Sequence, residues 1–319
     1  MTVRRRFGSE GRMRSRTIRS ELRRAIDSAA AQLAEAGIDS ARYDAEQLAA
    51  HLAGIERGRL TLLESPGDEF FGRYRDIVAA RSQRVPLQHL TGTAAFGPVL
   101  LHVGPGVFIP RPETEAILAW ATAQRLAASP VIVDLCTGAG TLAVALARHR
   151  PAARVIGIDD SDVALEYARR NAEGTAVELV CADVTELVSK PGLLPDLDGR
   201  VDLVVANPPY VPDDIVLEPE VAQHDPPHAV FGGPDGMAVI AAIVRLAGRW
   251  LRPGGLFAVE HDDTTSSQTV ELINSTGLFE DVQARQDLAG RPRFVTARWG
   301  HQPLAGEWGT THLWGERRL

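Results

Sequence analysis

The feature that most constrains the fold is a regular alternation of short β-rich runs with segments of helical composition from Val131 onward. The runs are nearly continuous in apolar residues: VIVDL, RVIGID, VELVCAD, VDLVVAN and LFAVEH. Such runs are typical of parallel strands that are buried on both faces, so we predict an open α/β sheet with helices on both faces. Two later runs, DVQARQDLAG and RPRFVTARW, are separated by a Gly turn and predict an antiparallel pair at the sheet edge.

A different pattern precedes the sheet. Between residues 15 and 85, apolar residues such as Ile18, Leu22 and Ile26 recur every three or four positions, which predicts amphipathic helices. Residues 86–112 alternate and are rich in turn residues, which favours a β-hairpin linker. We expect a helical substrate-recognition domain at 15–85, the linker at 86–112, a catalytic domain at 113–299, and tails at 1–14 and 300–319.

Composition limits the location and the partners of the chain. It contains no run of about 18 apolar residues and no secretory signal, so we expect a cytoplasmic protein that binds no membrane. The formal charge is -7, yet residues 1–24 hold nine Arg and two Glu, which leaves -14 for the rest. A body this acidic argues against direct nucleic-acid binding. Cys136 and Cys181 fit neither a metal site nor a disulfide framework.

The first candidate site is the turn in VIVDLCTGAG. Gly138 and Gly140 let the backbone approach a ligand at the carboxyl end of a strand, where open α/β sheets bind ligands. Asp159 ends the next run, 25 residues after Asp134, and can accept both hydroxyls of a ribose. Asp183 ends the third run and either accepts from an adenine amino group or caps a turn. These residues predict a nucleoside-type cofactor.

The most specific motif is Asn207-Pro208-Pro209-Tyr210 (the Asn-Pro-Pro-Tyr motif), which ends the fourth run. Two prolines remove two backbone donors, so the chain leaves the sheet as a rigid rim of acceptors. The Asn207 side-chain carbonyl and the Pro208 backbone carbonyl match the two N–H donors of a planar NH2 group. Tyr210 either walls that flat group or packs as an ordinary aromatic residue. We therefore predict recognition of an amide or exocyclic amine.

The motif also predicts the chemistry. An amide nitrogen is a poor nucleophile because its lone pair is delocalised. Holding both hydrogens aims the nitrogen and favours the charge that develops on it, while a sulfonium methyl at about 3 Å supplies much of the rest. No general base is needed. We expect a methyltransferase whose catalytic residues are Asn207, Pro208 and Tyr210.

With these residues together, the chain resembles the class I S-adenosylmethionine-dependent amino-methyltransferases. Within them, the segments QHLTGTAAFG, GVFIPRPETE, NPPYV, DPPHAVFGGPDGM and FAVEHD resemble the release factor glutamine methyltransferases of the HemK/PrmC family. The resemblance runs from about Ser15 to Trp299. It implies a seven-stranded Rossmann-like sheet, S-adenosyl-L-methionine as cofactor, and methylation of the glutamine in the Gly-Gly-Gln motif of class I peptide chain release factors.

The resemblance also implies roles for individual residues. The cofactor would be held by Cys136, Thr137, Gly138, Ala139, Gly140, Asp159, Asp183, Val184 and Asn207, and the glutamine by Phe108, Asn207, Pro208, Pro209 and Tyr210. Two positions depart from the family pattern. Cys136 stands where a first Gly is usual, and Val184 stands where an aromatic residue often follows the third acid.

Two alternatives remain at this point. The first is a nucleic-acid adenine N6-methyltransferase, because the exocyclic amine of adenine offers the same two N–H donors to the Asn-Pro-Pro-Tyr motif. The acidic charge of residues 25–319 argues against this alternative. A nucleotide-binding protein without transferase activity, or a nicotinamide-dependent oxidoreductase, would fit the α/β pattern. The missing third Gly of a dinucleotide turn and the presence of the Asn-Pro-Pro-Tyr motif count against both.

Overall fold

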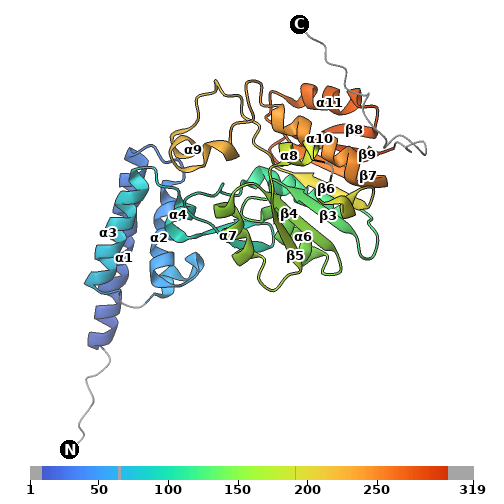
Figure 1. Cartoon of the computed structure of the whole chain (residues 1–319). Coiled ribbons are helices and arrows are strands. Elements are labelled where there is room, and N and C mark those ends of the chain that lie inside the picture. Colours follow the sequence, from blue (N-terminus) through green and yellow to red (C-terminus); the bar gives the residue numbers. More distant parts are fainter. Residues whose placement is uncertain (1–8, 64–65, 191, 301–319) are drawn as a thin grey trace, which may run out of the picture. The chain divides into compact units, whose positions relative to one another are not determined.

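The computed structural model describes residues 9–63, 66–190 and 192–300 (Figure 1). The chain divides into two compact units. The first contains the chain up to Ala94 together with Leu100–Ile109 and Val216–Pro226, and the second contains Ala95–Val99, Pro110–Ile215 and the chain from Pro227. No helix in the described part of the chain is long and apolar enough to cross a membrane.

The first unit is built from helices, as the apolar periodicity predicts. They are α1 (Ser9–Glu35), α2 (Ala41–Ala53), η1 (Arg57–Leu62), α3 (Asp68–Ser82), α4 (Leu87–Thr91) and α9 (Pro219–His224). Helix α2 buries Ala45, Leu48 and Ala49 completely, and this spacing places all three on one face. Gly54 ends the helix in a left-handed conformation (φ 64°), which satisfies the last carbonyls. The predicted β-hairpin is present as β1 (Thr93–Phe96) and β2 (Val99–His102).

A buried ion pair joins distant parts of this unit. Arg81 on α3 donates from Nε to Asp44 on α2 at 2.7 Å and from a terminal nitrogen to Glu220 on α9 at 2.9 Å. The Arg81 and Asp44 side chains are only 6% and 3% exposed, so removing Arg81 would leave the buried Asp44 carboxylate without its cation. Helix α9 is thereby tied to α3 although it lies 139 residues away in sequence.

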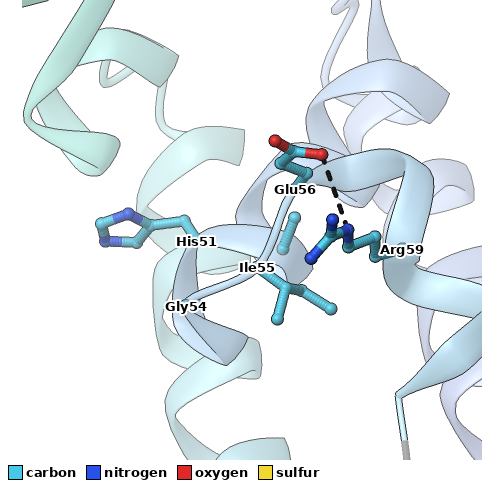
Figure 2. Close-up of a pocket in the computed structure, with 6 residues that line it drawn as sticks. His51, Gly54, Ile55, Glu56 and Arg59 are labelled. Atoms are coloured by element: carbon cyan, nitrogen blue, oxygen red, sulfur yellow. Dashed lines mark ion pairs between the residues drawn. The ribbon is translucent and has the colours of Figure 1, made fainter.

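The first unit also carries a surface hollow at the end of α2 (Figure 2). Its volume is about 440 Å³, and it is lined by Ala50, His51, Gly54, Ile55, Glu56 and Arg59. Arg59 and Glu56 form an ion pair at 3.7 Å across two well exposed side chains, which contributes little to stability. None of the site residues predicted from the sequence lines this hollow.

The second unit is a seven-stranded sheet in the order β5-β4-β3-β6-β7-β9-β8. Its strands are β3 (Val131–Leu135), β4 (Arg154–Asp159), β5 (Val177–Cys181), β6 (Val201–Ala206), β7 (Leu251–Glu260), β8 (Phe279–Gln286) and β9 (Pro292–Trp299). The first five strands in this order pair in parallel, whereas β9 pairs antiparallel to both β7 and β8. The structure confirms the predicted α/β sheet and its antiparallel edge.

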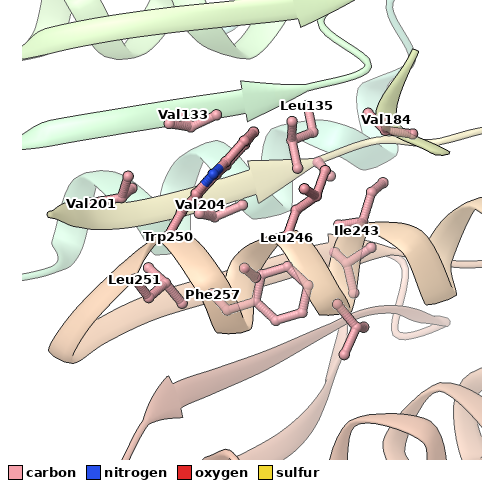
Figure 3. Packing of buried hydrophobic residues seen from close by; sticks show 14 of the residues in the cluster. Val133, Leu135, Val184, Val201, Val204, Ile243, Leu246, Trp250, Leu251 and Phe257 are labelled. Atoms are coloured by element: carbon pink, nitrogen blue, oxygen red, sulfur yellow. The ribbon is translucent and has the colours of Figure 1, made fainter. Parts of the chain in front are cut away.

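Helices cover both faces of this sheet (Figure 1). The helical segments of this unit are η2 (Pro112–Thr114), α5 (Glu115–Ala123), α6 (Thr141–His149), α7 (Asp162–Asn171), α8 (Val184–Ser189), η3 (Pro195–Leu197), η4 (Pro227–Ala229), α10 (Ala238–Trp250) and α11 (Ser266–Ser275). Trp250 and Leu246 of α10 pack on Val133 and Val204 of the central strands (Figure 3). These side chains are fully or almost fully buried, so the core holds β3 and β6 in register beneath the residues that follow them.

Candidate active site

The sheet brings the predicted strand-end residues to one edge. The turn at residues 136–140 follows β3, Asp159 ends β4, Asp183 follows β5 and Asn207 follows β6. These four strands are consecutive parallel neighbours, so their carboxyl ends face the same side. Residues spread over more than 70 positions of sequence therefore form one candidate site.

The turn after β3 has the left-handed backbone that glycine favours. Cys136, Gly138 and Gly140 have φ values of 58°, 55° and 81°. A side chain at Gly138 would meet no described atom within 4 Å, whereas one at Gly140 would meet Val144 at 3.2 Å. Gly138 thus borders open space that a ligand can fill, whereas Gly140 is favoured by its positive φ and by the close packing of Val144. Cys136, which departs from the family pattern, adopts a conformation that costs a residue with a Cβ about 1 kcal/mol.

Asp159 holds this turn against β4. Its Oδ2 accepts from the Gly138 N–H at 2.8 Å and its Oδ1 from the Ser161 N–H at 3.0 Å. Burial raises the pKa of Asp159, and these two backbone hydrogen bonds oppose the shift. Each carboxylate oxygen keeps a second lone pair, so the predicted contact with ribose hydroxyls is compatible with this geometry.

Asp134 stabilises the turn after β3 through hydrogen bonds. It is 1% exposed, and its Oδ2 accepts from the Thr137 hydroxyl at 2.6 Å and from the Ala143 N–H at 2.9 Å. Burial raises the pKa of Asp134 to about 7, partly offset by these hydrogen bonds. The carboxyl joins the turn to the first residues of α6. In the sequence, the role of Asp134 is indicated by an acidic residue near the end of an otherwise apolar strand.

The third acid acts as a helix cap. Asp183 Oδ1 accepts from the Thr185 N–H and the Thr185 hydroxyl, both at 2.7 Å. This is the turn-capping alternative left open from the sequence, and contact with adenine stays a prediction. Val184 packs its side chain into the hydrophobic core beneath the site (Figure 3), and its cofactor role also stays a prediction.

The Asn-Pro-Pro-Tyr motif is held by residues from two other elements. Asn207 Nδ2 donates to Thr114 Oγ1 at 3.0 Å, and the Tyr210 hydroxyl donates to Glu260 Oε1 at 2.9 Å. Glu260 is 1% exposed, and burial raises its pKa to about 7. Burial and the Glu260 charge together raise the pKa of Tyr210 well above its usual value, so Tyr210 stays a neutral donor. Tyr210 is thus more than an ordinary packing residue.

A glycine-rich loop supports the back of the motif. In residues 231–237 (the glycine loop), a Cβ on Gly232 would lie 2.6 Å from the Pro209 carbonyl oxygen, and one on Gly236 would lie 2.1 Å from the Tyr210 carbonyl oxygen. The Val211 N–H also donates to the Val230 carbonyl at 3.0 Å. Side chains at either glycine would displace the motif. The loop lies in a segment that carries the family resemblance, and its supporting role becomes visible only in the structure.

The remaining residues noted in the sequence are Phe108 and the two cysteines. Phe108 is half-buried and belongs to the first unit, and its contact with glutamine stays a prediction. Cys136 and Cys181 are free thiols. Burial and the nearby Asp159 raise the pKa of Cys136, which keeps it protonated.

Comparisons with known proteins agree with the class that the fold and site define, a methyltransferase. A methyltransferase-domain family model matches residues 132–217, and the PrmC N-terminal domain model matches residues 24–92. The chain is 77% identical over 291 residues to the release factor glutamine methyltransferase of Mycobacterium tuberculosis, covering 90% of this chain and 94% of that protein. The namesake from Mycolicibacterium smegmatis is 63% identical, covering 87% and 98%. The chain belongs to the release factor glutamine methyltransferase family.

One relative has a different name. The 4-amino-L-phenylalanine/4-methylamino-L-phenylalanine methyltransferase of Streptomyces pristinaespiralis is 42% identical over 274 residues, covering 83% of this chain and 91% of that protein.

Proposed function

We propose that this enzyme transfers a methyl group from S-adenosyl-L-methionine to the side-chain nitrogen of the glutamine in the Gly-Gly-Gln motif of class I peptide chain release factors. The observation that carries this proposal is the orientation of Asn207. Its Nδ2 donates to Thr114, so its Oδ1 points away from Thr114 and is presented as an acceptor. With the backbone carbonyl of Pro208, it forms the acceptor pair that fits an NH2 group.

The turn after β3 fits the cofactor. A nucleoside with a charged amino acid tail needs room at a strand end, backbone N–H groups and a carboxylate for its ribose. Gly138 supplies the room and Asp159 the carboxylate. The full proposed set is Cys136, Thr137, Gly138, Ala139, Gly140, Asp159, Asp183, Val184 and Asn207. When bound, the cofactor supplies an electrophilic methyl on a sulfonium centre.

The protein residues act on the glutamine. Asn207 and Pro208 accept its two N–H groups, which orients the amide and stabilises the positive charge that develops on nitrogen during transfer. Tyr210, fixed through Glu260, lines the flat face of the amide. Pro209 and Phe108 complete the proposed binding set. After transfer, the nitrogen carries a surplus proton of low pKa that leaves to water, so no dedicated base is required.

The first unit matches the PrmC N-terminal domain over residues 24–92, and we assign it to recognition of the release factor. The protein acts in the cytoplasm under this proposal, where release factors serve translation termination. Direct nucleic-acid binding is not part of it.

The test is mass spectrometry of a release factor after incubation with enzyme and S-adenosyl-L-methionine. One methyl group on the Gly-Gly-Gln glutamine is expected, and a variant factor with Gly-Gly-Asn is the control. Duplex DNA and free 4-amino-L-phenylalanine, the acceptor in the name of one relative, are run in parallel. Methyl transfer to either of these with none to the release factor would refute the proposal.

A further inference from the structure

The residue just before α5 is a threonine whose hydroxyl bonds to a residue far along the chain. Thr114 ends η2, and its backbone is already helical (φ -65°, ψ -19°), so it lacks the extended conformation from which a threonine side chain caps a helix. Among the described residues, its side chain makes no such cap bond. Its Oγ1 instead accepts from Asn207 Nδ2 at 3.0 Å, across 93 positions of sequence. The Thr114 hydroxyl is thus used for a contact with the candidate catalytic residue.

The hydrogen bonds around Thr114 have a direction. A threonine hydroxyl has one proton to donate and two lone pairs with which to accept. One lone pair receives the Asn207 N–H, and the Thr114 hydroxyl also lies near enough to the Glu260 carboxyl to lower its pKa. An Asn207 amide that donates from Nδ2 to this hydroxyl holds its Oδ1 on the side away from Thr114.

Glu260 supports the same motif at its other end. The Tyr210 hydroxyl donates to its Oε1 at 2.9 Å, so the Asn-Pro-Pro-Tyr motif is held at Asn207 by Thr114 and at Tyr210 by Glu260. Glu260 is the last residue of β7, the strand that pairs with β6 just before the motif. Thr114 is 2% exposed and so does not exchange its partners freely with water.

We propose that Thr114 is a positioning residue that sets which end of the Asn207 amide faces the substrate. This inference rests on the proposed function, since it concerns how Asn207 serves that reaction. Without the hydroxyl, the Asn207 amide loses the acceptor that keeps its NH2 inward. A turn of about 180° about its last side-chain bond then presents NH2 to the substrate NH2, and donor meets donor.

The test compares Thr114→Val, which is isosteric and lacks the hydroxyl, with Thr114→Ser, which keeps it. We expect Thr114→Val to lower kcat for methyl transfer by about 10-fold or more, as when a preorganised polar contact is weakened. Cofactor Kd should change much less than kcat, and Thr114→Ser should retain wild-type kcat within about threefold. Thr114→Ala replaces the valine variant if that variant does not fold. Full kcat per folded molecule in the hydroxyl-free variant would overturn the inference.

A double-variant cycle separates positioning from a general structural effect. If Thr114 acts through Asn207, then Thr114→Val should have no further effect on kcat in an Asn207→Ala background. Independent, multiplying losses would overturn the inference. A readout without turnover keeps it separate from the proposed function. With ¹⁵N-asparagine labelling, the Asn207 side-chain resonance, identified by its loss in Asn207→Ala, should shift in Thr114→Val and not in Thr114→Ser. An enzyme that leaves release factors unmethylated but shows this shift would refute the proposed function alone.

Discussion

Two neighbouring turns at the same edge of the sheet are built in opposite ways. Strands β3 and β6 pair in parallel, with Leu135 opposite Ala206, and each is followed at once by a site motif. After β3, three residues adopt positive φ and the turn keeps its N–H groups. After β6, two consecutive prolines remove theirs. The comparison indicates that glycine provides space and donors for a cofactor, whereas proline provides a rigid rim of acceptors for an NH2 group.

The two turns also differ in what supports them. The turn after β3 is held by acids within its own β-α-β segment, Asp134 and Asp159, and borders open space at Gly138. The rim after β6 is held from elements far along the chain, by Thr114 and by Glu260 with the glycine loop closely packed behind it. We therefore expect substitutions in the first turn to affect ligand binding, and substitutions around the second to affect stability and turnover.

The largest effect on stability should come from replacing a glycine by alanine, and the two regions are compared through Gly236 in the glycine loop and Gly138 in the turn after β3. Gly236→Ala places a Cβ 2.1 Å from the Tyr210 carbonyl oxygen at a φ of 73°, so both clash and backbone strain arise. We expect a loss of about 3 kcal/mol or more in the free energy of unfolding, with reduced kcat. Gly138→Ala has comparable φ and no described atom within 4 Å, so we expect about 1 kcal/mol and weaker cofactor binding. Chemical denaturation and cofactor titration check the pair, and equal stability losses would contradict the comparison.

The buried carboxyl behind the rim should give a pH-dependent effect. The folded pKa of Glu260 is raised from 4.5 to about 7, so the folded state holds a proton that the unfolded state has released between these values. Wild-type stability should therefore fall as pH rises from about 5 to 7, by about 3 kcal/mol from this group alone. Glu260→Gln keeps an acceptor for Tyr210 and cannot ionise. Its stability relative to wild type should rise over that pH window, and a constant difference in melting temperature would contradict this.

Much of this arrangement follows from local sequence. The strands, the acids that end them and the Asn-Pro-Pro-Tyr motif were predicted because each depends on a short pattern and on the shared direction of parallel strands. The cap role of Asp183 was one of two alternatives, since its partner Thr185 is only two residues away. The hydrogen bonds that support the rim were not predicted. Thr114 lies 93 residues from Asn207 and Glu260 lies 50 from Tyr210, and such pairs are set by how β6, β7 and α5 pack.

Asn207 tests the acceptor rim itself. Asn207→Ala removes one of two proposed acceptors, and we expect kcat to fall by about 100-fold. Cofactor affinity should fall much less, because Asp159 and the turn after β3 remain. Asn207→Asp keeps an acceptor and should retain more activity than alanine, with a lower melting temperature because its charge is part-buried without a full partner. Single-turnover methylation of a release factor measures both variants. Wild-type turnover in folded Asn207→Ala would remove the central role of the rim.

The smallest effect concerns the one residue of the β3 turn that is not glycine despite its positive φ. Cys136 has φ 58° and packs partly against the core. Cys136→Ala keeps a Cβ in this conformation and loses the sulfur, whereas Cys136→Gly removes the strain as well as more buried atoms. Glycine usually costs about 0.5–1 kcal/mol relative to alanine, but at a left-handed position it gains about 1–2 kcal/mol. We expect Cys136→Gly to be more stable than Cys136→Ala by about 0.5–1 kcal/mol, a melting-temperature difference of roughly 2 °C.

The same pair of substitutions at Thr137, whose φ is not positive, should give the opposite order and serves as the control. If alanine is the more stable replacement at both positions, the left-handed backbone at Cys136 is not a source of strain. The preference of this turn for glycine would then apply only to Gly138 and Gly140.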